Sequence, residues 1–532
     1  MNHKPQYLGL NRAIFEDLIK HDCIYIDKTK IIYELITAPG AQQFYFISRP
    51  RRFGKSLFLS TLKSIFSGDK ELFDQYWIGR QTNYPWPKHP VIHLDFSKIA
   101  HSNAQEFKQS ICFALQKIAT DHAIKKLKGV APGDMLQDLV QTLQANGKIV
   151  LLIDEYDKPL VDHITKLPIA EENRTVLNNF YTTVKALEAN WRAIFITGVS
   201  KFTKTSLFSG LNNIQELTFD PIAAELFGYT QEELITNFSP LIDNLAKNIN
   251  RTKDETLDKM KHWYDGYRFS KDMTKQPMYS PLSVIASLHK KEFSNYWFDT
   301  GTPGFLIPLL RLKGEALEIP DIIQTPISSF NAFDIKDISI IALLVQTGYL
   351  TINDYNSNTG IFTLDYPNQE VRESFKNYLL QAFAYTNHGD IDMKLMLMRN
   401  AINLQNFENF FHAIRTLFAG IPYDKHIARE AYYHSLFHLT FDLLGMRPRS
   451  EEASSRGKAD LVLETPDTIT IFEFKYDSSA QKALDQILQK KYYEKYLNTN
   501  KTIILIGVNF DFKNKQLEFK WLQQNISKTI NE

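Results

Sequence analysis

Short apolar runs alternate with amphipathic stretches in the first part of the chain. Four runs are nearly uniformly apolar and indicate strands: FYFIS (44–48), VIHLDF (91–96), KIVLLID (148–154) and RAIFITG (192–198). Three intervening stretches have apolar residues at helical spacing: 56–66, 103–119 and 174–187. Apolar strands separated by helices are typical of a parallel sheet covered on both faces. The pattern therefore predicts an α/β fold for this part.

The pattern changes further along the chain. Residues 230–330 are helical and aromatic in character, and residues 390–420 also indicate helix. Around 338–375, helices leading into a small hairpin predict a winged-helix-like segment. The C-terminal part predicts these elements in order: helix (428–445), strands (458–464 and 468–475), helix (479–497), strand (502–508) and a further strand around 516–521. This order predicts a second, smaller α/β unit.

Composition narrows the class of protein without pointing to a partner. A chain of 532 residues is too long to fold around a single hydrophobic core, which suggests several domains. The formal net charge of +1 produces no overall attraction to nucleic acid or membranes. Cys23 and Cys112 are too few for a disulfide framework or a structural zinc site, which fits a reducing cytoplasm. We find no signal-peptide core and no uninterrupted apolar stretch of about 18 residues, so we expect no membrane span.

The strand at 44–48 leads into a basic turn that ends in Gly54-Lys55-Ser56. A phosphate-binding loop normally reads G-x-x-x-x-G-K-[ST], and Arg49 stands at the position of the first glycine. Such a loop needs a strand before it and a helix after it, because backbone N–H groups and the helix N-terminus face the phosphates. Both are predicted here. We expect Lys55 to reach the β- and γ-phosphates and Ser56 to ligate Mg²⁺.

A second motif follows about a hundred residues later, where an apolar strand ends in Asp154-Glu155. We expect Asp154 to hold the Mg²⁺ shell and Glu155 to polarise the attacking water. A buried strand with a solvated acidic turn would look the same. Both motifs, however, end strands of one parallel sheet and should share its crevice. Thr197 or Ser200, ending another strand, is either a γ-phosphate sensor or merely a small polar residue.

The C-terminal part contains Asp460, Glu473 and Lys475 in the order D-x12-E-x-K on a predicted hairpin. Alternation places Glu473 and Lys475 on one face of the strand and Phe474 on the other. Carboxylates can hold the Mg²⁺ that neutralises charge during phosphodiester hydrolysis, while Lys475 would orient or help deprotonate water. Glu430, on the preceding helix, is a further candidate ligand. The alternative is an exposed hairpin with cross-strand charge pairs.

Other polar residues near this hairpin support weaker interpretations. Gln486 and the lysines of SAQKALDQILQKKYYEKY could face a phosphate backbone. His434 and His438 lie four residues apart and could share a helix face. Without a visible third ligand, we interpret them as core or surface residues.

Five stretches in order carry a resemblance to a known family: residues 7–36, SRPRRFGKSLFLSTLKSIF, LLIDEYDKPL, FITGVSKF and YWFDTGTPGFL. They resemble the bacterial AAA-ATPase-like family, which is commonly fused to a C-terminal nuclease-like domain of the PD-(D/E)XK superfamily. The family's loop is similar to R-P-R-R-F-G-K-S, which implies that losing the first glycine need not disable it. The resemblance also implies that residues 7–29 pack near the nucleotide, with Tyr25 and Asp27 as candidates for the base pocket.

The arginines of the loop allow two interpretations. Arg49, Arg51 and Arg52 could bind phosphate or act in trans as arginine fingers. They could equally form a solvated basic turn that balances the neighbouring acids.

These observations and the resemblance together predict three parts: an AAA-ATPase-like P-loop domain (1–230), a helical and winged-helix-like segment (231–380) and a PD-(D/E)XK nuclease-like domain (400–525). The expected nucleotide-binding residues are Arg52, Gly54, Lys55, Ser56, Leu57, Asp154 and Thr197. The expected metal ligands are Ser56 and Asp154 at one site and Asp460, Glu473 and Glu430 at the other. Glu155, Asp460, Glu473 and Lys475 are the expected catalytic residues.

The predicted cofactors are ATP and Mg²⁺, with Mg²⁺ or Mn²⁺ at the nuclease-like site, and the predicted macromolecular partner is nucleic acid. ATP hydrolysis would gate a metal-dependent nuclease. Two alternatives stay open: a non-cleaving, ATP-switched regulator that binds nucleic acid, and an ATP-gated protein-interaction module. The oligomeric state is open, with a homo-oligomer as one option.

Overall fold

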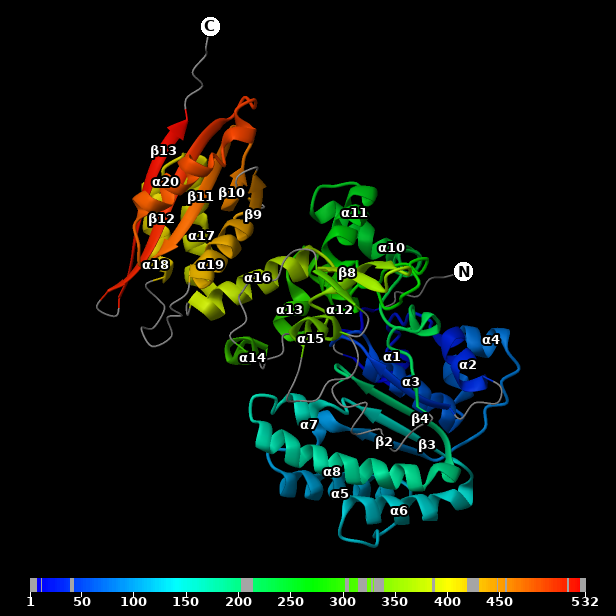
Figure 1. Ribbon diagram of the computed structural model, residues 1–532. Coiled ribbons are helices and arrows are strands. Elements are labelled where there is room, and N and C mark those ends of the chain that lie inside the picture. Colours follow the sequence, from blue (N-terminus) through cyan, green and yellow to red (C-terminus); the bar gives the residue numbers. More distant parts are fainter. Residues whose placement is uncertain are drawn as a thin grey trace. The chain divides into compact units, whose positions relative to one another are not determined.

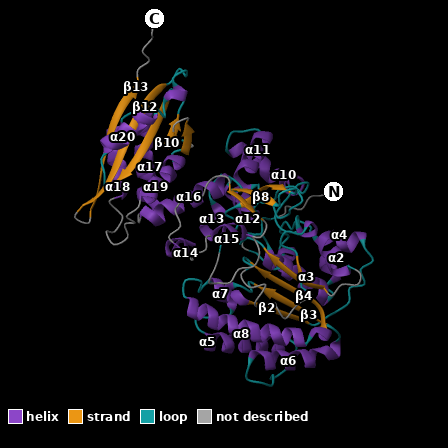
Figure 2. Cartoon of the chain, viewed as in Figure 1, coloured by secondary structure: helices purple, strands orange, loops and turns teal. Residues whose placement is uncertain are grey.

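The computed structural model describes residues 7–10, 12–38, 43–201, 214–301, 306–313, 323–326, 329, 339–384, 388–418, 430–446, 448–454, 457–513 and 516–526. The chain divides into two compact units (Figure 1). The first comprises residues 1–312 and 321–372, and the second residues 313–320 and 373–532. Each unit contains a five-stranded sheet. Figure 2 colours the strands of both units orange.

The first unit is built on a parallel sheet with strand order β2-β3-β4-β1-β5. Its strands are β1 (Gln43–Ser48), β2 (Val91–Asp95), β3 (Ile149–Asp154), β4 (Trp191–Gly198) and β5 (Gln215–Glu216). All neighbouring strands pair in parallel. The predicted parallel α/β fold is therefore confirmed. Because β4 lies between β1 and β3, the carboxyl ends of these three strands meet at one edge of the sheet.

Helices cover both faces of this sheet (Figure 1). The helices around it are α1 (Phe15–Lys20), α2 (Thr29–Thr37), α3 (Lys55–Ser67), α4 (Trp77–Gln81), α5 (Ala104–Asp121), α6 (Pro132–Leu143), α7 (Lys158–Val161) and α8 (Leu167–Ala186). Successive side chains of β4 point to opposite faces of the sheet, so the core has two parts. On one face, Ile194 and Ile196 pack with α5, α6 and α8. Phe195 points the other way and contacts Phe58 and Phe66 of α3.

A helical segment with a small antiparallel sheet completes the first unit. Its helices are α10 (Gln231–Asn248), α11 (Lys253–Tyr264), α12 (Pro281–Lys290), α13 (Tyr296–Gly301), α14 (Leu306–Lys313) and α15 (Ile340–Thr347). The sheet has the order β6-β8-β7, with β6 (Ile323–Pro326), β7 (Thr351–Asn356) and β8 (Ile361–Asp365). Capping boxes at Thr230 and Thr252 begin α10 and α11. The order α15, β7, β8 matches the expected helix and hairpin.

The second unit has a mixed sheet of order β13-β12-β11-β10-β9. Its elements are α16 (Gln369–Ala384, shared with the first unit), α17 (His388–Asn403), α18 (Phe407–Phe418), α19 (Glu430–Leu443), β9 (Arg449–Ser454), β10 (Gly457–Glu464), β11 (Thr468–Tyr476), α20 (Ala480–Lys490), β12 (Thr502–Lys513) and β13 (Gln516–Ile526). The strands β11 and β12 pair in parallel, and the other neighbours are antiparallel. This arrangement confirms the second, smaller α/β unit.

The core of the second unit lies on both faces of its sheet. On one face, Leu484 and Ile487 of α20 pack against β10, β11 and β12. On the other face, Phe437 of α19 contacts Phe474 and Phe510. A side chain on β11 therefore faces either α20 or α19, and this choice determines the surroundings of the acidic motif.

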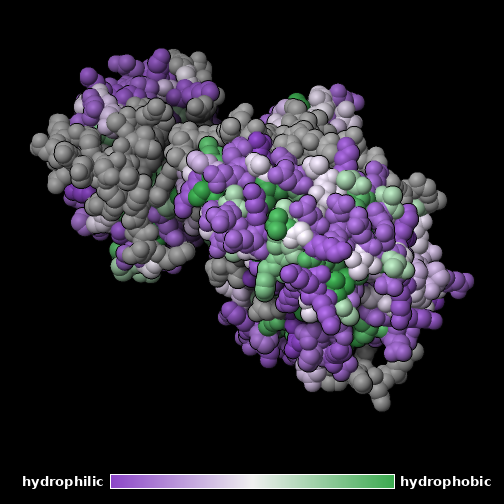
Figure 3. Space-filling model, turned by 90° about the horizontal axis from the view of Figure 1, so that it is seen from below, coloured by the Kyte–Doolittle hydropathy of each residue, from purple (hydrophilic) through white to green (hydrophobic). Residues whose placement is uncertain are grey.

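The surface is predominantly polar on the face that Figure 3 shows, where hydrophobic side chains form small patches among hydrophilic ones. Within the described residues, we find no helix that combines the length and apolar character needed to cross a membrane.

Candidate functional site

The loop between β1 and α3 contains two residues with left-handed backbone conformations. Arg52 and Gly54 both adopt left-handed conformations, with φ of +66° and +93°. Glycine takes this conformation without steric cost, which explains Gly54 at the start of α3. A loop of this kind turns backbone N–H groups toward one side, ahead of the helix N-terminus, where a phosphate can bind. Ser56 and Leu57 follow in the first turn of α3.

Lys55 lies against the loop from which it extends. Its side chain is buried, and Nζ donates to the carbonyls of Arg49 and Pro50, both at 2.9 Å. Burial lowers the pKa of Lys55, whereas the carboxylates of Asp154 and Glu155 act in the opposite direction. The ammonium group is therefore bonded to the loop itself and lies within electrostatic reach of the acidic end of β3; its contact with the β- and γ-phosphates stays a prediction.

Arg49 has a different role from the other two arginines of the loop. Its guanidinium is buried and donates to the carbonyls of Ser48 (2.9 Å), Thr218 (2.7 Å) and Ala223 (2.9 Å). Burial lowers the pKa of Arg49 to about 9. Arg49 thus supports the loop from inside, while Arg52 is exposed and Arg51 partly exposed. Of the two interpretations, phosphate or interface contact stays a prediction for Arg51 and Arg52 alone.

The acidic end of β3 contacts the neighbouring strand. Asp154 is 2% exposed, and its Oδ1 accepts from the Thr197 hydroxyl at 2.6 Å. Thr197 in turn lies opposite Ile47 of β1, one residue before the loop strand ends. The structure therefore brings Asp154 and Thr197 together beside the phosphate loop. The oxygens of Ser56 and Asp154 are of the kind that Mg²⁺ prefers.

Glu155 begins the turn after β3 with φ of +50°, which is unusual for a residue other than glycine. Burial raises the pKa of Glu155, and the nearby Lys55 opposes this rise. Strained backbone of this kind often occurs at functional sites.

Asp157 is a buried acid that the sequence analysis did not single out. Its Oδ2 accepts from the N–H of Val199 (3.1 Å), the N–H of Ser200 (2.7 Å) and the hydroxyl of Ser200 (2.6 Å). It therefore joins the turn after β3 to the segment after β4. Ser200 bonds with Asp157, whereas Thr197 bonds with Asp154, so the two candidate sensors have different partners; a γ-phosphate contact stays a prediction for either. The sequence contained one signal for this residue, because Asp157 is the third acidic residue of the stretch DEYD.

A pocket with a cavity volume of about 100 Å³, partly open to solvent, lies beside Gly54 and Leu57. Aromatic and aliphatic side chains form most of its walls, including Tyr25, Phe53 and Tyr229. Such a pocket suits a planar base next to a phosphate loop. Asp27 does not line this pocket; its carboxylate accepts from Thr29 and from the N–H of Trp77, which positions α2 and α4.

The second site lies where β10 and β11 separate. Their paired residues end with Leu461 and Phe472. Beyond this pair, the carboxylate of Asp460 accepts from the N–H of Phe474 at 2.7 Å. Asp460 is thereby held beside the strand that carries Glu473.

Glu473 is 1% exposed, and its two oxygens have different surroundings. Oε1 accepts from Lys475 Nζ at 3.0 Å and from Gln486 of α20. Oε2 is buried and has no hydrogen-bond partner among the described residues. Burial raises the pKa of Glu473 to about 7, and the nearby Asp460 adds to the rise. A buried, unpartnered carboxylate oxygen next to a second carboxylate fits a divalent cation.

The two faces of β11 confirm the expected alternation. Glu473, Lys475 and Gln486 meet on the side of α20, while Phe474 packs against α19. Tyr492, which the sequence analysis did not single out, also belongs to this group, because its hydroxyl accepts from Gln486 Nε2 at 3.4 Å.

The remaining candidates near this site differ in what the structure says of them. Glu430 begins α19, but its side chain lies outside the described residues. His434 bonds to the backbone carbonyl of Asp460 at 2.8 Å and contacts the ring of Phe474. Across the described ranges, no group of three or more His, Cys, Asp or Glu side chains could hold a metal ion. Among the described side chains, Asp460 and Glu473 are the carboxylates of the predicted ligand set, and Mg²⁺ is commonly bound by one or two carboxylates together with waters or substrate phosphates.

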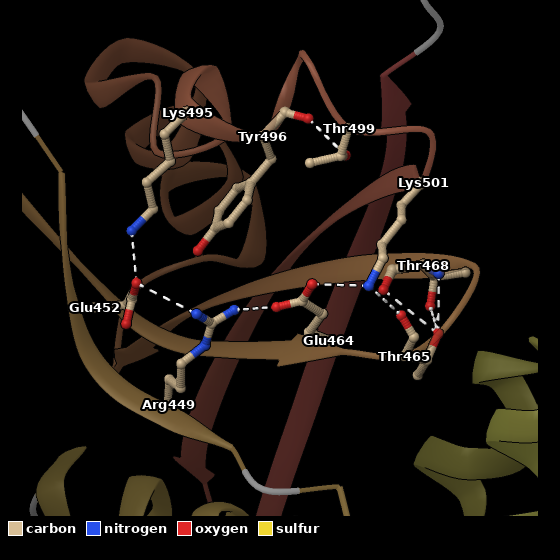
Figure 4. A network of polar contacts seen from close by, with 9 residues as sticks. All are labelled: Arg449, Glu452, Glu464, Thr465, Thr468, Lys495, Tyr496, Thr499 and Lys501. Carbon is tan, nitrogen blue, oxygen red and sulfur yellow. Dashed lines mark hydrogen bonds and ion pairs between the residues drawn. The ribbon is translucent and has the colours of Figure 1, made fainter.

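Part of the basic charge near β10 is already paired. Figure 4 shows a chain of contacts from Lys495 through Glu452, Arg449 and Glu464 to Lys501. Lys495 Nζ lies 2.7 Å from Glu452, and Lys501 Nζ lies 2.7 Å from Glu464. The other lysines of the predicted basic run, Lys482, Lys490 and Lys491, are exposed. These three lysines are therefore the better candidates for contact with a phosphate backbone.

Comparison with known proteins agrees with the two expected kinds of domain. Residues 11–208 match the family described as "Predicted AAA-ATPase", and residues 428–520 match the PD-(D/E)XK nuclease superfamily. The chain is 34% identical over 511 residues to the "Uncharacterized protein in vnfD 5'region" of Azotobacter chroococcum mcd 1, which covers 92% of this chain and 93% of that protein. The chain belongs to the predicted AAA-ATPase family and carries a PD-(D/E)XK nuclease-superfamily domain in its C-terminal part.

Proposed function

We propose that the first unit binds and hydrolyses ATP with Mg²⁺. Lys55 and the loop N–H groups would bind the β- and γ-phosphates, and Ser56 and Asp154 would hold the cation. Glu155 would polarise the attacking water, and Thr197, Arg52 and Leu57 would complete the site. The observation that carries this proposal is the 2.6 Å contact between Thr197 and Asp154 next to the loop that holds Lys55.

The second unit would cleave phosphodiester bonds of nucleic acid. Asp460 and Glu473 would hold Mg²⁺ or Mn²⁺, which would neutralise charge on the phosphate when bound, and Lys475 would orient the water. The buried, unpartnered Oε2 of Glu473 supports this assignment. In this proposal residues 1–230, 231–380 and 400–525 are the ATPase domain, the connecting segment and the nuclease-like domain.

A second candidate function is a regulator that binds nucleic acid without cutting it. One observation favours it: Lys475 donates to both Glu473 and the carbonyl of Phe474, each at 3.0 Å, so the protein itself occupies its ammonium group. In either case, ATP state would control the second unit.

The two functions differ in one assay. Wild type and Lys475→Ala are incubated with Mn²⁺ and with single- and double-stranded DNA and RNA. The nuclease proposal expects cleavage by the wild type and its loss in Lys475→Ala. Binding without cleavage by both proteins, with affinity that falls steeply with salt because phosphate contacts release counterions, would support the regulator instead.

A further inference from the structure

The segment after residue 260 contacts the phosphate loop directly. Trp297 of α13 is fully buried, and its indole Nε1 donates to the carbonyl of Arg51 at 2.9 Å. Gly348 lies against Pro50 so closely that a Cβ there would come within 2.7 Å of the proline ring. Phe53 packs edge-on against Tyr267, with ring centroids 4.7 Å apart. Three residues of the loop, Pro50, Arg51 and Phe53, thus contact residues outside the parallel sheet.

The same segment also contacts the chain that follows β4. The side-chain oxygen of Gln346, on α15, accepts from the N–H of Lys201 at 2.9 Å. Gln346 is 5% exposed, so water competes little for this bond. The segment after residue 260 therefore contacts both the phosphate loop and the chain that follows Thr197.

Trp297 is fixed in turn by a buried carboxylate. Glu370 is fully buried, its Oε1 accepts from the backbone N–H of Trp297 at 2.6 Å, and its Oε2 accepts from the Ser283 hydroxyl at 2.7 Å. Hydrogen bonds to a charged acceptor are stronger than neutral ones, which makes this a firm link.

Glu370 lies in the first turn of α16, which runs from Gln369 to Ala384. The division between the two units falls inside this helix, after Arg372. A continuous path of bonds therefore leads from the phosphate loop through Trp297 and Glu370 to the helix that enters the second unit.

We infer that Trp297 is a positioning residue of the nucleotide site, and that its bond to Glu370 passes a change in the phosphate loop on to α16. This inference rests on the proposed function, because it takes ATP as the ligand of the loop. Replacing Trp297 would disturb the phosphate loop, whose backbone N–H groups can bind phosphate only while they keep their direction. Losing the indole donor frees the Arg51 carbonyl and should lower ATP affinity about 3- to 10-fold.

The first test compares Trp297→Phe with Trp263→Phe in the full chain. Phenylalanine keeps an aromatic ring at either position but removes the five-membered ring together with its N–H, so both variants lose the same atoms. Trp263 serves as the control of the same residue type: it lies on α11, is partly buried, and packs with its ring 6.1 Å from that of Phe293. We expect Trp297→Phe to lower ATP affinity and to lose the ATP-induced change in tryptophan fluorescence. Trp263→Phe should retain both.

The result separates the inference from the proposed function. If wild type binds no ATP, the proposed function fails, and this inference fails with it. If wild type binds ATP and the two variants bind it equally well with equal fluorescence changes, only the positioning role of Trp297 is wrong. Melting curves of both variants exclude general unfolding as the cause of weaker binding.

The second test follows the link into α16 by hydrogen exchange of residues 373–384. ATP should slow exchange there in wild type, and Glu370→Gln should reduce this difference by at least half while ATP still binds. Glutamine keeps the size of the side chain but weakens the bond to Trp297. Ser283→Ala is the milder variant if Glu370→Gln does not fold, and it should give a smaller loss. An ATP-dependent difference of wild-type size in the folded variants would overturn the link.

Discussion

Replacing Glu473 by glutamine tests whether the buried carboxylate at the second site destabilises the protein when no cation is bound. The rise in the pKa of Glu473 from 4.5 to about 7 corresponds to about 3 kcal/mol of unfavourable ionisation in the folded protein. Glutamine has the same size and still offers an oxygen to Lys475 and Gln486. Without metal, at pH 8, we therefore expect the variant to stabilise the second unit by about 1–3 kcal/mol.

The pH dependence has a definite sign. Because the pKa of Glu473 is higher in the folded than in the unfolded state, its protonated form favours folding. That contribution is complete below about pH 4.5 and is lost as the pH rises through about 7. The wild type should thus lose stability between pH 5 and pH 8 in the absence of metal, and Glu473→Gln should lose less.

The assay measures hydrogen exchange of the β11 and β12 amides in a buffer that contains a chelator. Exchange at these amides reports the stability of the second unit alone. Glu464→Gln is a matched control on β10, because Glu464 is exposed and paired with Lys501. That variant should lose up to about 1 kcal/mol. Added Mn²⁺ should stabilise wild type and not Glu473→Gln. A variant that is less stable than wild type at pH 8, or equally protected by Mn²⁺, would refute the argument.

Three further predictions concern the first unit. Lys55→Ala should reduce ATP affinity at least about 100-fold, because the ammonium and the loop N–H groups act together on the phosphates; unchanged affinity in a folded variant, measured by calorimetry, would contradict this. Glu155→Gln should bind ATP normally but hydrolyse it more slowly, and wild-type turnover would show that Glu155 is only a strand-end acid. The hydrogen bond to Asp162 raises the pKa of His101, so this pair should stabilise the unit below about pH 6.5 and lose that effect at higher pH; urea unfolding of wild type and His101→Gln should differ at pH 6 and converge by pH 9.

The strands of the parallel sheet could be predicted closely from the sequence. The run at 148–154 corresponds to Ile149–Asp154, because a strand buried on both faces needs apolar residues throughout. The strand Arg449–Ser454 was missed, since RSEEAS forms the edge of its sheet and carries charged and polar residues. The helix predicted at 479–497 ends at Lys490, where Lys491 turns into the left-handed conformation. Its apolar spacing continues because Tyr492 and Tyr496 still pack in the core.

The acidic and basic residues of both sites were visible in the sequence, but their supports were not. The meeting of Asp154 with Thr197 follows from strand ends in one parallel sheet. The burial of Arg49 depends on carbonyls at positions 218 and 223, which no local pattern connects to the loop. The contact between Trp297 and Arg51 joins residues 246 positions apart. Such contacts are set by how the helical segment packs, and a single sequence does not reveal that.

The central claim is that ATP at the first site controls a metal-dependent nuclease at the second. The most direct measurement is the rate of cleavage of single- and double-stranded DNA and RNA as a function of ATP concentration, with Mn²⁺ present, for wild type, Lys55→Ala and Lys475→Ala. We expect cleavage by the wild type to change with ATP, cleavage by Lys55→Ala to be independent of ATP, and Lys475→Ala to be inactive throughout. Cleavage that is unaffected by ATP in wild type, or that persists in Lys475→Ala, would contradict the account.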